Sequence, residues 1–443
     1  MKSRFALLPV LIGTVMFVDA GPGVGATPPA TQCAPAANYA AATTPVAFWS
    51  TEARCAIVPP TAGPENFGNK FPGEAAVYMG IVHAAIYDAT VAVYGGYRPY
   101  GNVAVRPRAG ASPDAAIAAA AHDTLLGLQP ALGLTAPQQA ILDGDYAAYI
   151  AAMQDSQAKD DGVAVGKQVA AGIVALRAND GREQNPTLAD LNPPAADPGV
   201  WRPNPASTPG SPAPPVLGLR LPETRPLALK SASQFRPGQP NALTSKGYAE
   251  DLQQVETLGR ADSIVRTADQ TTQALFWTDH DLRQWNDGML RLAASRRLSE
   301  LQTARMLAMA HVAGGDAMVA CFDAKFHYWF WRPYQALAQL DPTWQPLRPT
   351  PNFPEYPSAH ACHSGALTRA LRAFFHTDKV TLTLDSRVTH TARTYARLSD
   401  VVKDVNQARV LAGFHFWSSD LTGAKLGRKV GSYVAGHLFQ PIG

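Results

Sequence analysis

Apolar residues recur at helical spacing along most of this 443-residue chain, and this period constrains the fold more than any other feature of the sequence. Residues 73–93, for example, place Tyr78, Met79 and Val82 at the intervals of a buried helix. Strand signals are scarce, and the best is the short run 380–384. The sequence therefore predicts an all-α fold of packed helical bundles. The helical pattern, often rich in the strong helix former alanine, covers 73–93, 115–128, 136–153, 162–178, a segment starting near 247, 268–276, 282–298, 300–322, 358–375, 393–411 and 421–439, with Gly413 and Gly423 as interruptions.

The long connection 183–243 departs from this pattern. Its repeated prolines deny the backbone its helical hydrogen bonds, yet apolar residues such as Trp201, Leu217 and Phe235 are too frequent for a solvated tether. We expect the connection to wrap over the helical core and to border the mouth of the active site. Residues 27–443 are thus predicted to form a single helical catalytic unit.

The first 26 residues are typical of a secretory signal peptide. Lys2 and Arg4 precede an apolar run over residues 5–18, and small residues follow. No later stretch reaches the roughly 20 uninterrupted apolar residues of a membrane span. The sequence therefore predicts a secreted or periplasmic protein without a membrane span.

Four cysteines bear on the same prediction, because an exported chain meets an oxidising compartment. Cys33 and Cys55 are close enough in sequence to close a short loop, and we predict a disulfide between them. Cys321 and Cys362 are interpreted as buried free thiols, with a bridge between them as the alternative. The net charge of +3 comes without basic blocks, so no nucleic-acid partner is expected.

Cationic and imidazole residues gather in the region 320–443. Two arginines, a lysine and two histidines can surround a tetrahedral oxyanion, because such an ion needs donors and positive charges from several directions. The sequence therefore predicts a site for phosphate or vanadate. The three motifs are Lys325-x6-Arg332-Pro333, Pro357-Ser358-Ala359-His360 and Arg409-x5-His415.

The spacing within each motif carries its own expectation. Lys325 and Arg332, seven apart, would share one face if a single helix carries both. Ser358 is expected at a helix N-cap, from which it and the amide of Ala359 can donate to an anion. Arg409 and His415 are six apart and need a backbone distortion to converge. Chelation of a metal ion by His360 and His363 is the less favoured alternative.

The order and spacing of these motifs resemble the signature shared by the vanadium-dependent haloperoxidases and the type 2 phosphatidic acid phosphatase superfamily. Further resemblance to bacterial vanadium haloperoxidases lies in residues 78–88, 97–100, 118–126 and 323–333. The resemblance implies two four-helix bundles, with the oxyanion at the end of one of them.

The resemblance also implies roles for individual residues. His415 would bind the vanadium of a vanadate cofactor, and His360 would be the acid and base. Phe353 matches a possible halide site. Position 419, where the family has an acid, is Ser419 here with Asp420 next to it, so the group that orients His415 is left open. The oxygens of vanadate or phosphate would be held by Lys325, Arg332, Ser358, the amide of Ala359, which replaces the usual glycine, and Arg409.

Three functions follow from this resemblance. The leading hypothesis is a haloperoxidase that oxidises halide with hydrogen peroxide, in a site dried by Trp329, Phe330, Trp331 and Phe353, and without need of an organic-substrate pocket. The alternative is a soluble acid phosphatase, in which His415 attacks a phosphate ester and phosphate, with no cofactor, fills the site. The third hypothesis is an oxyanion-binding protein without catalysis.

Overall fold

The computed structural model describes residues 44–101, 110–206 and 211–442. The predicted signal peptide and Cys33 lie outside these residues. The described part is mainly helical, which confirms the all-α prediction. Its helices are α1 (Pro45–Ile57), α2 (Pro72–Tyr94), α3 (Pro113–Gly127), α4 (Ala136–Ala151), α5 (Gln157–Leu176), α6 (Lys246–Leu258), α7 (Ala268–Phe276), α8 (Asp281–Ser295), α9 (Glu300–Tyr328), α10 (Pro333–Leu337), α11 (Ala359–Phe375), α12 (Leu398–Leu411) and α13 (Trp417–His437), and its strands are β1 (Leu382–Ser386) and β2 (Thr391–Tyr395).

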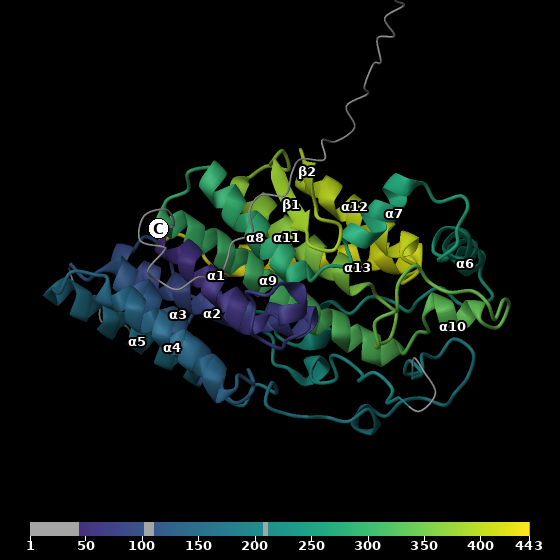
Figure 1. The fold of residues 1–443 in the computed structure, drawn as a ribbon, viewed down its shortest axis with the longest axis horizontal. Coiled ribbons are helices and arrows are strands. Elements are labelled where there is room, and N and C mark those ends of the chain that lie inside the picture. Colours follow the sequence, from purple (N-terminus) through teal and green to yellow (C-terminus); the bar gives the residue numbers. More distant parts are fainter. Residues whose placement is uncertain (1–43, 102–109, 207–210, 443) are drawn as a thin grey trace, which may run out of the picture.

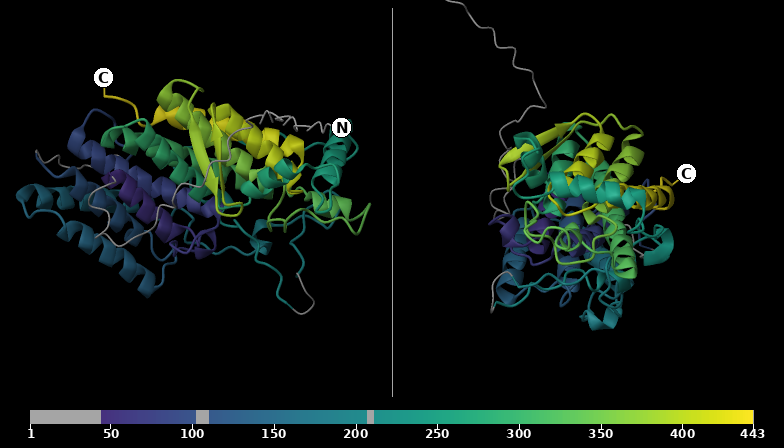
Figure 2. Two further views of the ribbon diagram at one scale, coloured as in Figure 1. Left: turned by 45° about the horizontal axis from the view of Figure 1, so that its top comes forward. Right: turned by 90° about the vertical axis from the view of Figure 1, so that its right-hand side faces the viewer.

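The helices form two groups that meet along α2 and α9. In the first group α3 packs between α2 and α5, with α1 and α4 against it. In the second, α11 packs against α9, α12 and α13. Figure 1 shows the first group in purple and blue and the second in green and yellow, and the same division is visible from two other directions in Figure 2.

Helix α2 is the apolar centre of the first group. It is long and apolar enough to cross a membrane by length and composition, but 89% of its most apolar window is buried inside the fold. The expectation that no later stretch approaches a membrane span overlooked this helix, because Tyr78, His83 and Asp88 interrupt its apolar run without lowering its mean hydropathy below that of a span. In this structure α2 is a core helix.

Helices α11 and α13 approach each other through glycines. A Cβ atom at Gly427 would lie 2.0 Å from the carbonyl oxygen of Cys362, and one at Gly423 would lie 2.5 Å from that of Ser358. The sequence suggested that Gly423 interrupts a helix. In the structure α13 continues through Gly423, and the missing side chain lets α11 and α13 approach each other. The contact also joins their first turns, since the amide of Ser358 donates to the carbonyl of Ser419 at 3.2 Å.

The helix predicted at 393–411 differs from the observed structure. The pattern at 393–411 begins inside strand β2, which pairs antiparallel with β1 and which the sequence analysis missed. Thr383 and Thr394 face each other in this hairpin at 2.9 Å between their hydroxyls. Tyr395, the last residue of the strand, donates from its hydroxyl to Asp404 of α12 at 2.7 Å, which ties the hairpin to that helix. Long-range contacts thus decide a segment whose local pattern is ambiguous.

The connection 183–243 packs on the helices, as expected. Asp316 of α9 accepts hydrogen bonds from the amides of Leu227, Ala228 and Leu229 at 2.5 to 2.8 Å. Earlier in the connection, the amide of Leu217 donates to the carbonyl of Asn352 at 3.0 Å. These contacts satisfy backbone groups that proline-rich sequence cannot pair within itself.

The cysteines agree with the sequence interpretation where they are described. Cys55 is disulfide-bonded, and its predicted partner lies outside the described residues. Cys321 and Cys362 are buried free thiols, with 2.7 Å between their sulfurs.

The helix contact generates a test of stability. Gly427→Ala should lower the free energy of unfolding by about 1 to 3 kcal/mol, because the new methyl group overpacks the contact between α11 and α13. Gly436 lies in the same helix with no atom within 4 Å of its would-be Cβ, so Gly436→Ala should raise the free energy by up to about 1 kcal/mol. Denaturant unfolding of both variants checks this, and equal effects would contradict the packing argument.

Candidate active site

Two of the predicted cations approach the site from the end of α9 and from the loop after it. Lys325 lies in the last turn of α9, and its Nζ donates to the carbonyls of Pro354 and Glu355 at 2.9 and 2.8 Å. Helix α9 ends at Tyr328 because Trp329 adopts a left-handed conformation with φ of 51°. One helix therefore does not carry both cations, and the condition under which they would share a helix face is not met.

Arg332 instead lies at the N-cap of the short helix α10, which Pro333 begins. Its Nε donates to the carbonyl of Phe353 and its Nη1 to that of Phe414, both at 2.9 Å. The ring of Phe353 lies under both cations, 5.1 Å from the Lys325 Nζ and 4.8 Å from the Arg332 guanidinium. The aromatic face thus offsets part of the cost of burying the two charges.

The second motif begins helix α11. Ser358 is its N-cap residue, but the side chain makes no capping hydrogen bond. The expected position is confirmed, and the expected capping contact is not formed. Within the described chain Nε2 of His360 is buried without a hydrogen-bond partner, whereas the buried Ser358 hydroxyl lies beside Asp420 and acts on the pKa of that carboxyl through a hydrogen bond. Ala359 lies between them in the first turn.

The third motif converges through the distortion that the sequence analysis expected. Gly413 follows α12 with φ of +76°, which a residue with a Cβ rarely adopts, and the amide of Phe414 returns to the carbonyl of Arg409 at 3.1 Å. His415 then lies against the first motif, with Nε2 3.1 Å from Nη1 of Arg332. The Nη1 of Arg409 donates to the carbonyl of Trp277 at 2.7 Å.

Glu355 is the site residue that the sequence analysis missed. Its Oε1 lies 2.8 Å from Nδ1 of His415 and accepts from the amide of Phe416 at 3.1 Å, while Oε2 accepts from the Ser419 hydroxyl at 2.7 Å. Glu355 thus provides the carboxylate that position 419 lacks. The only signal in the sequence is a charged residue between Pro354 and Tyr356 in an otherwise apolar motif.

These contacts fix the tautomer of His415. Because a carboxylate accepts at Nδ1, this nitrogen carries the proton, and Nε2, which faces an arginine donor, has the lone pair. Burial, with Arg332 and Lys325 nearby, holds the pKa of His415 well below its ordinary value. His415 is therefore a neutral imidazole whose unprotonated Nε2 accepts from Arg332 in this structure, and an unprotonated nitrogen is the form that binds a metal centre or attacks phosphorus.

The three cations are costly to bury without an anion. Burial lowers the pKa of Lys325 to about 8, and those of Arg332 and Arg409 to about 10. Burial also raises the pKa of Glu355 to about 7, although Lys325 opposes this shift. Burial thus displaces each group toward its neutral form, and the buried carboxylates of Glu355 and Asp420 offset this shift only in part for the two arginines.

Neighbouring charges act in opposite directions on the pKa of His360. Burial, followed by repulsion from Arg409, lowers its pKa to about 3, while Asp281 acts in the opposite direction. The carboxylate of Asp281 is hydrogen-bonded to Nδ1 of His363 at 2.9 Å, which accounts for His363 without a metal ion. In the described ranges there is no group of three or more His, Cys, Asp or Glu residues placed to hold one.

The donor set fits a tetrahedral oxyanion. Three buried nitrogen atoms in the described part of the chain lack a partner and belong to predicted site residues, namely Nη2 of Arg332, Nε2 of His360 and Nε of Arg409. Such atoms are normally paired in a native protein, so their grouping around the unprotonated Nε2 of His415 points to a ligand rich in acceptors. Vanadate and phosphate both meet this requirement.

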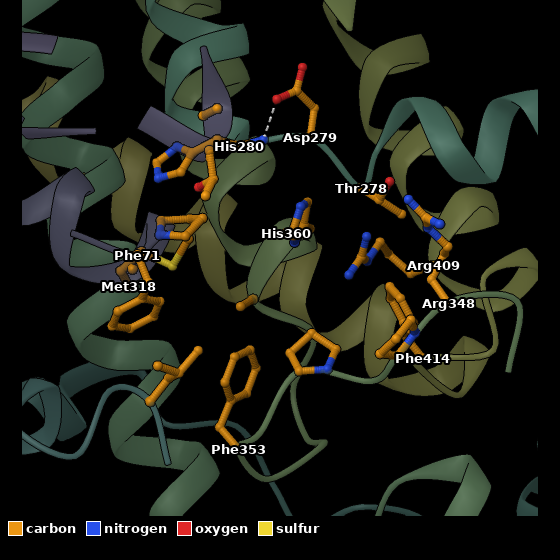
Figure 3. A pocket seen from close by; sticks show the side chains of 18 of the residues that line it. Phe71, Thr278, Asp279, His280, Met318, Arg348, Phe353, His360, Arg409 and Phe414 are labelled. Atoms are coloured by element: carbon orange, nitrogen blue, oxygen red, sulfur yellow. Dashed lines mark hydrogen bonds between the residues drawn. The ribbon is translucent and has the colours of Figure 1, made fainter. Parts of the chain in front are cut away.

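A cavity of about 640 Å³ opens onto these residues. Phe353, Ala359, His360 and Arg409 line it, whereas Lys325, Arg332, Ser358 and His415 are not among the lining residues. Figure 3 shows His360 near the centre of the cavity and Arg409 to one side of it. The residues expected to dry the site, Trp329, Phe330 and Trp331, are buried but do not line the cavity. Its other aromatic residues are Phe71, Phe322 and Phe414.

Comparison with known sequences identifies relatives of this region. Residues 305–443 match the family model of the VCPO second helical-bundle domain. The vanadium chloroperoxidase of Curvularia inaequalis is 26% identical over 171 residues. That match covers 31% of this chain and 28% of the relative, so the chain aligns with less than a third of that protein's length.

Solved structures share the fold over a larger part of the chain. A bacterial vanadium-dependent iodoperoxidase superposes with a TM-score of 0.73 at 22% identity, covering 89% of this chain and 95% of the other. The apo form of a bacterial vanadium-dependent chloroperoxidase gives a TM-score of 0.66 at 16% identity, covering 83% and 94%. The overall helical arrangement is therefore that of these proteins.

Glu355 generates a test by substitution. Glu355→Ala leaves three buried donors without their acceptor and removes a carboxyl group near the buried Lys325 and Arg332, so it should lower the free energy of unfolding by about 3 to 5 kcal/mol. Glu355→Gln keeps the size and one acceptor and should cost about 1 to 2 kcal/mol. Urea unfolding measures both. The control, Glu250→Ala, removes an exposed carboxylate of α6 and should change stability by less than about 0.5 kcal/mol. An alanine variant as stable as the glutamine variant would refute this role.

The raised pKa of Glu355 predicts a pH dependence of stability. Its ordinary pKa is 4.5, and in the folded protein it is about 7. Between these values the folded state holds more protons than the unfolded state, so the contribution of Glu355 to stability falls as pH rises. Relative to Glu355→Gln, the unmodified protein should lose about 2 to 3 kcal/mol between pH 4.5 and 7. A difference between the two proteins that stays constant with pH would contradict the shift.

Proposed function

Because the chain belongs to the vanadium haloperoxidase family, we propose that it is an exported vanadium-dependent haloperoxidase that oxidises halide with hydrogen peroxide. The observation that carries this proposal is the unprotonated Nε2 of His415, fixed by Glu355 and surrounded by buried donors without partners. The proposed export rests on the signal-peptide pattern of residues 1–26.

The cofactor would be vanadate, held by this chain's own donors. Nε2 of His415 would bind the vanadium, and the oxygens would be held by the side chains of Lys325, Arg332, Ser358 and Arg409 and the amide of Ala359. When bound, vanadate supplies the activation of peroxide and the transfer of an oxygen atom to halide. The protein supplies charge neutralisation and orientation in a site that excludes most water.

His360 would move the proton. With its pKa lowered to about 3 by burial and by Arg409, the imidazole is neutral at ordinary pH, and its unpaired Nε2 can accept a proton from hydrogen peroxide. A bound oxyanion would offset the repulsion from Arg409 and make the protonated form less costly. The same nitrogen can then return the proton to the departing oxygen.

Phe353 would act at the halide. Its ring lies in the cavity wall and also under Lys325 and Arg332. An apolar surface beside positive charge suits a large, weakly hydrated anion, because that anion loses little hydration there. The proposal therefore extends to halide binding in the cavity beside Phe353.

The proposed function is tested by halide oxidation with purified protein. With vanadate, peroxide and iodide or bromide, the protein should form triiodide or brominate a phenolic dye, and without vanadate it should not. His360→Ala should lower kcat about 10²- to 10⁴-fold. His327→Ala removes an exposed histidine from the same region and should leave kcat unchanged.

Two outcomes would overturn the proposal. Hydrolysis of an aryl phosphate that vanadate inhibits, with no halide oxidation, would establish the phosphatase alternative. Tight vanadate binding with neither reaction would establish the non-catalytic one.

A further inference from the structure

The cavity beside His360 is much larger than halide and peroxide require. These reactants each occupy a volume on the order of one or two water molecules, about 30 Å³ each, whereas the cavity measures about 640 Å³. Cavities of that size bind organic ligands. We propose that this cavity binds an organic acceptor, an aromatic ring that carries an anionic group, beside the oxyanion site. This inference rests on the proposed function and names its substrate class.

One wall of the cavity suits a flat ring. Phe71, Phe322 and Phe353 lie together there, with ring centroids 5.7 Å apart for the first pair and 5.1 Å for Phe322 and Phe353. Met318 adds a polarisable thioether on the same side, and Figure 3 shows it next to Phe71. Aromatic rings and thioethers favour an aromatic ligand over a flexible aliphatic one.

The opposite side of the cavity carries an uncommitted charge. Arg348 lines the cavity and is exposed, and no described residue forms a salt bridge or hydrogen bond with its side chain. Figure 3 shows Arg348 beside Arg409 and Phe414, across the cavity from Phe71. Its guanidinium is thus available to a carboxylate or phenolate whose ring lies on the aromatic wall.

The position of Arg348 is held by its neighbours along the chain. The amide of Leu347 donates to the carbonyl of Gly259 at 3.1 Å, and the carbonyl of Thr350 accepts from the side chain of Asn204 at 2.6 Å. Anchors on both sides keep this loop at the cavity mouth. A cation in a defined place can select a ligand.

The acid among the lining residues does not neutralise Arg348. Asp279 is buried, and its Oδ2 accepts from the guanidinium of Arg283 and the amide of Arg387, both at 2.7 Å. Its Oδ1 accepts from the amide of His280 at 2.6 Å. With this carboxylate committed, the accessible charge of the cavity is positive, which fits an anionic acceptor.

A bound acceptor would capture the oxidant where it forms. In the reaction ArH + X⁻ + H₂O₂ + H⁺ → ArX + 2 H₂O, the halide loses two electrons to peroxide, and the ring exchanges a proton for the halogen. The proton that leaves the ring ends in the second water molecule, so one proton is consumed overall. The sequence suggested that no organic-substrate pocket is needed. The proposal instead gives the protein such a pocket, with a preference for an anionic aromatic ring.

Binding tests the subsite directly. The probes are 4-hydroxybenzoate and its neutral counterpart of similar size, 4-hydroxybenzamide, titrated calorimetrically into the mature protein with vanadate bound, so that the oxyanion site is filled. The benzoate should bind about fivefold more tightly, as expected for one exposed ion pair. Arg348→Gln should remove this preference, and Arg348→Lys should restore most of it. The control, Arg428→Gln, removes an exposed arginine of α13 away from this cavity and should preserve the preference.

Triiodide formation without any organic acceptor, measured on the same samples, separates the two proposals. If triiodide forms but neither probe binds, or if Arg348→Gln keeps the preference for the benzoate, the subsite is refuted and the proposed function stands. If the probes bind with the Arg348-dependent preference and no triiodide forms, the aromatic-anion site stands and the haloperoxidase proposal fails.

Discussion

Three buried cations, Lys325, Arg332 and Arg409, set the main constraint on this structure. Each enters an interior built from apolar helix faces, where charge is costly unless it is paired. Backbone carbonyls of irregular segments accept hydrogen bonds from these cations. The carbonyls of residues 353–355 and 414 accept from Lys325 and Arg332, and the carbonyl of Trp277 accepts from Arg409. The loops between helices are therefore shaped by the charges that they hold, and these contacts leave some donors unused for an oxyanion.

A second buried polar group ties the two halves of the molecule together. Ser50 of α1 bonds to His83 of α2 at 3.1 Å and to Asn286 of α8 at 2.9 Å, and Asn286 in turn bonds to His311 of α9 at 3.0 Å. The rings of His83 and His311 stack 4.5 Å apart. Apolar helices can slide past one another at little cost, whereas a polar group of this kind is satisfied in one register only. It therefore fixes the position of α2 against α9, the helix that carries Lys325 of the site.

Sequence alone predicted the helices with a strong apolar period and the three motifs around the oxyanion, because both depend on local spacing. It did not predict that α9 ends at Tyr328, since the aromatic run that follows retains helical character and only the left-handed turn at Trp329 ends it. Glu355 was missed for a different reason. Its role depends on His415, 60 residues away in the chain, and a long-range pairing of this kind has no local signature. Strand β2 was missed for the same reason, because it is defined by its pairing with β1.

The close approach of α11 and α13 has a consequence for how this protein can change. With backbone in contact with backbone at Gly423 and Gly427, neither helix can shift without the other. Ser358, the N-cap residue of α11, and Ser419, in the first turn of α13, are thus carried on one rigid pair of helices. The loop around Arg348 and the connection that contributes Leu217 are held by hydrogen bonds instead of by such close backbone packing, and both border the cavity. Substitutions that change the substrate range are therefore expected to accumulate in those two segments, while the oxyanion-site residues carried by α11 and α13 stay the same.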